Sequence, residues 1–166
     1  MAETTRGAAA AARLDAATAE MIAEAERLPA GLPHWRPAEG VWSVMEILCH
    51  VDEFIPYWTG QALQIISDPA RTWGRTHSDT SRLDAVGRAD ARTLSDVLAS
   101  LKNGARQSGD RLKQLKDADL DVEATSTNPR WGTKPASFVV DQLIVEHVEK
   151  HIGQIRRNVQ QYEEKR

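Results

Sequence analysis

The stretch that decides the fold is residues 43–67, which read SVMEILCHVDEFIPYWTGQALQIIS. Apolar side chains recur along it at three- and four-residue steps, which is the period of an amphipathic helix. Its first four residues, Ser43-Val44-Met45-Glu46, have the spacing of a capping box, in which a hydroxyl and a carboxylate each satisfy a backbone amide. The stretch therefore predicts a long helix that starts at a defined residue and buries one face in a core.

Three further segments carry the same period, at about residues 8–28, 93–115 and 135–162. No convincing strand pattern lies between them. Amphipathic helices without strands bury their apolar stripes by packing on one another. The sequence therefore predicts an all-α fold, a four-helix bundle, as a single domain over residues 1–166.

The connections between the predicted helices are unequal in length. Those at 68–92 and 116–134 are long for a minimal bundle, which favours loops that carry function or cover a site. Both an up-down-up-down order and an order with a crossover fit such loops. The tryptophans in these loops and at the helix entrances either plug an end of the bundle or line a pocket; they are Trp35, Trp42, Trp73 and Trp131.

The composition excludes several classes of protein. The 21 basic and 24 acidic residues leave a net charge of −3, so the chain has no strong positive field to bind nucleic acid or an anionic membrane. No apolar run approaches the ~20 residues that cross a bilayer. The single cysteine, Cys49, excludes an internal disulfide, and we expect a cytoplasmic protein. We interpret Cys49 as a small core residue.

The candidate chemistry lies in the histidines. His147 and His151 are four residues apart on the last predicted helix, so both rings project from one face and can hold one ion. With His50 they occupy apolar faces, where an imidazole must find a partner or stay neutral at a cost. Three such rings around Zn²⁺ or Ni²⁺ would leave a position open for water or substrate. The alternative is three separate core histidines, because the sequence does not show that the second and fourth helices are neighbours.

Two carboxylates flank His50 on its own helical face, Glu46 four residues before it and Glu53 three residues after it. Either could orient the imidazole, complete a coordination shell or act as a catalytic base. The competing interpretation is that Glu46 only caps the helix and that Glu53 is solvated. We treat both as candidate catalytic residues.

Taken together, these motifs resemble the DinB/YfiT-like superfamily over about residues 14–160. The resemblance rests on the order and spacing of four pieces: Trp35-x-Pro37, Val41-Trp42-Ser43, the segment 46–53, and the segment 147–155 with its HxxxHxxQ pattern. It implies a four-helix bundle, often a homodimer, that binds zinc or nickel through three histidines. The matching positions are His50, His147 and His151.

One position departs from the family pattern. Family members often carry an acid directly after the first histidine of the last motif, where this chain has Val148. The contact that this acid would make is then either missing or supplied from elsewhere, for which Glu46 and Glu146 are the candidates.

The resemblance implies a small-molecule substrate and two kinds of activity. One is a metal-dependent thiol S-transferase that uses a low-molecular-weight thiol on small electrophiles, with the metal lowering the pKa of the thiol. The other is a metal-dependent hydrolase, in which the metal lowers the pKa of water. A third hypothesis is a non-catalytic metal-binding protein of the stress response. The S-transferase is the leading hypothesis.

Overall fold

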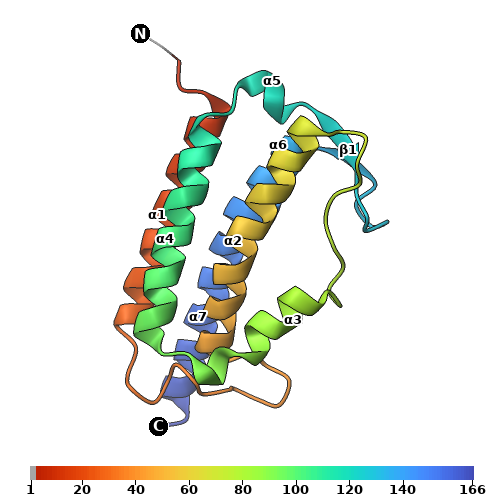
Figure 1. Ribbon diagram of the computed structural model, residues 1–166. Helices are drawn as coiled ribbons and strands as arrows, with labels where there is room; N and C mark the ends of the chain where they lie inside the picture. The colour runs from red at the N-terminus through yellow and green to blue at the C-terminus, as the bar shows by residue number, and fades with distance from the viewer. Residues whose placement is uncertain (1–2) are drawn as a thin grey trace.

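The computed structural model describes residues 3–166, and four long helices dominate it (Figure 1). The last of the four follows directly on two shorter helical pieces, α6 and a π-type segment η2. These elements confirm the all-α bundle and the four predicted helices to within a few residues at each end. Their bounds are α1 Arg6–Glu26, α2 Val44–Ser67, α4 Leu94–Lys113, α6 Ala136–Phe138, η2 Val139–Val145 and α7 Glu146–Glu164.

The helix order contains a crossover. In Figure 1, α1 and α7 run in one direction along the bundle, whereas α2 and α4 run in the other. Because α2 and α4 are parallel, the connection between them must return along the bundle, and it carries α3 (Thr80–Gly87) and the short helix η1 (Ala89–Ala91). Helix α1 packs mainly on α4, while α2 packs on α4 and on η2 and α7. Of the two orders that the sequence left open, the structure therefore has the crossover.

The helix starts follow the sequence signals. The Ser43 hydroxyl accepts the Glu46 amide at 3.1 Å, and the Glu46 carboxylate accepts the Ser43 amide at 3.0 Å, which is the predicted capping box. The Thr93 hydroxyl caps α4 by accepting the Asp96 amide at 3.1 Å. Both caps satisfy backbone donors that a helix terminus leaves free, and so they fix where α2 and α4 begin.

The second long connection holds a small hairpin that the sequence did not predict. After α5 (Asp117–Leu120), strand β1 (Glu123–Thr125) pairs antiparallel with β2 (Thr133–Pro135). Each strand has three residues, which is too short to show an alternating pattern. Helix α3 was also missed, since it buries none of its residues and so has no apolar stripe.

Trp73 joins the connection between α2 and α4 to this hairpin. Its side chain is fully buried, its indole N–H donates to the Ala124 carbonyl at 2.8 Å, and its ring stacks on Trp131 at 5.7 Å between centroids. Gly74 follows with φ +87°, a conformation that favours glycine and lets the chain turn between Trp73 and Arg75. The two long connections are thus joined beside α2.

Among the helices of residues 3–166, none combines the length and the apolar character that a membrane crossing requires.

Candidate metal centre

The structure brings His50, His147 and His151 together between α2 and α7. One ring nitrogen from each lies within 4.8 Å of the others, and in the described part of the chain this is the group of histidine, cysteine and acidic side chains that could hold a metal ion. The ring centroids of His50 lie 5.3 Å from His147 and 5.0 Å from His151. The proximity that the sequence left open is therefore a feature of the fold.

Hydrogen bonds set the tautomers of two of these rings. Nδ1 of His147 lies 3.1 Å from the Leu143 carbonyl, and Nδ1 of His151 lies 2.8 Å from Oε1 of Gln154. Because both oxygens can only accept, each Nδ1 carries the hydrogen and donates. In the neutral ring, Nε2 then keeps a lone pair for a metal.

The Leu143 carbonyl belongs to the π-type segment η2, which ends at Val145, two residues before His147. Such segments are rare and are frequently found at functional sites, because the wider turn displaces carbonyls and side chains from their α-helical positions. No sequence signal for this segment was recognised.

Burial keeps all three histidines neutral. His50 is 4 % exposed and His151 9 % exposed. Burial, followed by the charges of the neighbouring histidines, lowers the pKa of His50 to about 2, and burial lowers that of His147 to about 3. Burial also lowers the pKa of His151, although its bond to Gln154 acts in the opposite direction. Neutral imidazole is the form that binds metals.

Two of the ring nitrogens, Nδ1 of His50 and Nε2 of His151, are buried without a hydrogen-bond partner among residues 3–166. A buried polar atom without a partner costs about 1–3 kcal/mol, and a native fold rarely keeps two of them side by side. A divalent cation bound among the three rings would satisfy ring nitrogens of this kind, and imidazole ligands suit first-row transition metals, zinc and nickel among them. The donor set present in the chain therefore fits a metal.

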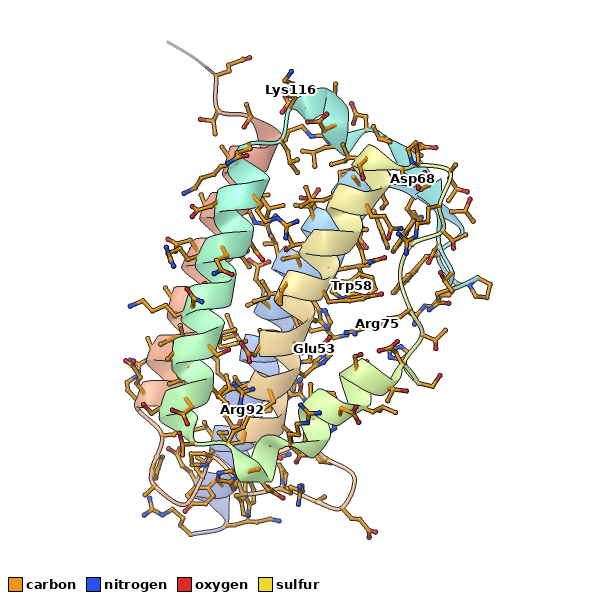
Figure 2. All side chains as sticks on the ribbon, in the orientation of Figure 1. Glu53, Trp58, Asp68, Arg75, Arg92 and Lys116 are labelled. Atoms are coloured by element: carbon orange, nitrogen blue, oxygen red, sulfur yellow. The ribbon has the colours of Figure 1, made fainter. Side chains whose placement is uncertain are left out.

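The two carboxylates near His50 already have cationic partners. Glu46 accepts from Nε of Arg36 at 2.6 Å in addition to its capping bond. Glu53 forms an ion pair with Arg75, which reaches toward α2 from the connection (Figure 2). Neither belongs to the three-histidine group. Their catalytic role stays a prediction.

A cavity of ≈360 Å³ opens beside the histidines, and both His50 and His147 lie in its wall. Its apolar wall contains Trp58, Trp131 and Phe138, contributed by α2, the hairpin loop and α6. The two long connections thus cover a site, as their length predicted. The charged residues that line it are mainly cationic: Arg75, Arg82, Arg130 and Lys150.

Aromatic rings hold the histidines in place. Phe54, one turn after His50 on α2, stacks on His147 with 3.9 Å between centroids and 10° between planes. Trp42 meets the edge of His50 at 5.1 Å. Of the loop tryptophans, Trp131 lines the cavity and Trp42 contacts the site, whereas Trp35 packs on Tyr162 near the end of α7.

Several of these residues were not found from the sequence. Gln154 stood in the quoted HxxxHxxQ pattern, which was the available signal for its bond to His151. The cationic residues Arg75 and Arg82 lie in and after an irregular loop, where no periodic pattern marks them. Cys49 is buried with a pKa raised by burial, which agrees with its interpretation as a core residue.

Solved structures with the same fold include two with functional descriptions. YfiT from Bacillus subtilis, described as a probable metal-dependent hydrolase with an unusual four-helix bundle topology, has 13 % identity and a TM-score of 0.79, covering 98 % of this chain and 90 % of its own. A mycothiol-dependent maleylpyruvate isomerase has 11 % identity and a TM-score of 0.69, covering 88 % of this chain and 59 % of its own.

No curated protein matches the chain significantly. The sequence profile of the DinB superfamily, in contrast, matches residues 13–155, which include the three histidines and all four long helices in whole or in large part. Because this match covers most of the chain, the protein belongs to the DinB superfamily.

Proposed function

We propose that this protein is a metal-dependent thiol S-transferase that acts on small electrophilic molecules, with a zinc or nickel ion held by His50, His147 and His151. The observation that carries the proposal is the pair of partnerless ring nitrogens, Nδ1 of His50 and Nε2 of His151, in a neutral three-histidine group at the wall of a cavity. A divalent cation bound there would supply Lewis-acid chemistry, lowering the pKa of a thiol.

In S-transfer, a thiol gives up its proton, its sulfur forms a bond to an electrophilic carbon, and the leaving group departs with the electron pair of the broken bond. The chain supplies what this reaction needs from a protein. Trp58 and Trp131 give the cavity an apolar wall, and the cationic residues favour an anionic sulfur. A volume of ≈360 Å³ suits a small molecule.

The positions of the carboxylates favour S-transfer over hydrolysis. A metal lowers the pKa of bound water only to about 7, so hydrolysis at neutral pH gains from a base that takes the proton, and Glu46 and Glu53 are both held by arginines. A thiol of lowered pKa is deprotonated at neutral pH without such a base. S-transfer therefore depends less than hydrolysis does on a free carboxylate at this site.

Metal-dependent hydrolysis is the second candidate, and one observation favours it. The carboxylate of Glu146 lines the cavity next to His147 and forms no ion pair within residues 3–166. It is the acid in this part of the structure that could serve as a base. The exchange Glu146→Gln separates the two candidates, because it would abolish hydrolysis and leave S-transfer largely intact.

The metal is tested by analysis of protein purified without a polyhistidine tag. We expect about one zinc or nickel ion per wild-type chain, and loss of nearly all of it in His147→Ala, since a three-ligand site cannot spare a ligand. His77→Ala is the matched control, because His77 is exposed at the cavity and lies outside the three-histidine group. Equal metal in wild type and His147→Ala would refute the site.

The reaction is tested with the metal-loaded protein, a panel of low-molecular-weight thiols and a chromogenic chloronitroarene. Thiol-dependent turnover that disappears on chelation supports the proposal. Failure of every thiol with retained ester hydrolysis would support the second candidate. Full metal loading without either activity would indicate a metal-binding protein without catalysis.

A further inference from the structure

The cavity beside the histidines carries a charge opposite to that of the whole chain. The chain has a net charge of −3, yet four cationic side chains line the cavity: Arg75, Arg82, Arg130 and Lys150. Against them stands a single lining carboxylate of the described residues, that of Glu146. Like charges gathered in one concave surface repel one another, so the arrangement costs energy unless an anion joins it.

One of the four is already neutralised inside the protein. Arg75 is buried, pairs with Glu53 and Asp79, and stacks its guanidinium on Tyr57 at 3.8 Å from the ring centroid. Even so, its Nε is buried without a hydrogen-bond partner. Arg75 is therefore a fixed part of the cavity wall whose charge is already paired, and it is not available as a ligand's main partner.

Arg82, Arg130 and Lys150 differ from Arg75 in having no carboxylate at ion-pair distance within residues 3–166. Arg130 and Lys150 are exposed, where water solvates them, but Arg82 is half-buried on α3. Burial and the charge of Arg75 lower the pKa of Arg82, and the charge of Glu53 offsets this only in part. Arg82 is thus the cationic group of the cavity whose charge is least satisfied by the protein and by water.

Arg82 is also placed to act at the metal centre. Its Nη1 donates to the His77 carbonyl at 3.1 Å, and its guanidinium carbon lies 5.6 Å from the ring centroid of Trp42, which in turn contacts His50. Its charge contributes to the lowered pKa of all three histidines. Arg82, His50 and His147 line the same cavity, so a group bound to the free N–H donors of Arg82 would share that cavity with the histidines.

We propose that Arg82 binds a carboxylate of the small molecule that occupies this cavity, with Arg130 and Lys150 adding attraction at the exposed side. A guanidinium can bind both oxygens of a carboxylate through two parallel N–H donors, which fixes the orientation of the ligand as well as its charge. This inference deepens the proposed function and rests on it for the reaction that the ligand undergoes. The carboxylate belongs either to the thiol or to the electrophile.

Two pairs of probes distinguish these sources, each pair differing only in a carboxylate replaced by an amide. N-acetylcysteine and N-acetylcysteine amide test the thiol, and 4-chloro-3,5-dinitrobenzoate and its benzamide test the electrophile. Binding is measured by calorimetry on zinc-loaded and on metal-free protein. In at least one pair we expect the carboxylate to bind about tenfold more tightly than the amide, the size of one charge-assisted hydrogen bond.

The preference should disappear in Arg82→Gln and persist in part in Arg82→Lys, which keeps the charge and loses the paired donors. The matched control is Arg88→Gln, which removes the same charge from an exposed residue at the end of the same helix, outside the cavity. It should bind as the wild type does. Thermal unfolding of each variant checks that the fold is intact, and Arg82→Lys tests the proposal if Arg82→Gln unfolds.

The two proposals fail in different ways. A wild type that loads zinc but binds acid and amide equally in both pairs overturns the role of Arg82 and leaves the metal site standing. Equal carboxylate preference in wild type and Arg82→Gln overturns it as well. A protein that loads no metal but keeps the preference in its metal-free form overturns the metal site alone.

Discussion

The bundle has two sides that differ in what they bury: the pair α1 and α4, and the pair α2 and α7. Helices α1 and α4 bury apolar side chains such as Leu14 and Leu101, and they approach closely at Gly7, where a Cβ atom would lie 2.3 Å from the Leu112 carbonyl. Helices α2 and α7 bury His50 and His151 among their apolar side chains, each with a ring nitrogen that has no partner in the described part of the chain. The side formed by α1 and α4 is satisfied by apolar packing, whereas the side formed by α2 and α7 leaves buried polar atoms unsatisfied.

This difference locates function without reference to any relative. A buried polar atom without a partner costs about 1–3 kcal/mol, so ordinary selection for stability would replace these histidines by leucine or isoleucine. A sequence that breaks the packing rule at one place and obeys it elsewhere marks the place where something other than stability is maintained. The predictions below test this contrast through the stability of the metal-free protein and its affinity for metal.

The largest effect is expected from acid on the metal-free protein. The pKa values of His50 and His147 fall to about 2 and about 3, and that of His151 also falls, so the folded chain holds fewer protons than the unfolded chain below pH ~6.5. Stability must then decrease as the pH drops, by up to about 1.4 kcal/mol per pH unit for each histidine. Urea unfolding with a chelator at pH 7, 6 and 5 measures this decrease.

The control for the acid effect is His151→Leu, which removes one of the three sites. Its free energy of unfolding should depend less steeply on pH than that of the wild type, because unfolding of the variant takes up at most one proton fewer. A wild-type stability that is constant between pH 7 and pH 5 would show that the rings are not held neutral by burial.

The apolar side should respond to the loss of volume rather than to pH. Leu14→Ala removes a fully buried side chain of α1 and leaves a cavity, which costs about 2–5 kcal/mol. The same loss should appear at pH 7 and at pH 5, and the affinity for metal should not change in the folded protein. Urea unfolding and metal titration measure the two quantities; an altered metal affinity would show that the two sides are coupled.

The same contrast separates what the sequence could predict from what it could not. The long helices follow from apolar periods and from caps such as Ser43, which are local properties of the chain. The histidines were identified as candidates because they interrupt these periods. The three rings lie together, however, only because α2 and α7 are neighbours. That neighbourhood follows from the crossover, and no local sequence pattern predicts it. Arg82 has its role only because that crossover returns along α2.

The bond between Gln154 and His151 should affect metal affinity without supplying a ligand. Gln154→Ala removes the acceptor that fixes the tautomer of His151, and the loss of such an outer partner typically costs about 10–100-fold in affinity. Competition with a chelator of known affinity measures it. Gln160→Ala is the matched control, because Gln160 is exposed on the same helix and its side chain donates to Glu164, away from the histidines. Equal metal affinities of Gln154→Ala and wild type would show that fixing the tautomer of His151 does not affect metal binding.

The smallest change in stability is expected for His50→Leu, and its comparison with Leu14→Ala is the most direct test of the difference between the two helix pairs. His50→Leu replaces a buried ring, with its partnerless Nδ1, by an apolar side chain of similar size. In metal-free protein at pH 7 this change should be nearly neutral or stabilising, because it removes a desolvation cost and leaves little cavity. Urea unfolding in a chelator compares it with Leu14→Ala. A loss as large as that of Leu14→Ala would mean that His50 is retained for packing, and the contrast between the two sides would disappear with it.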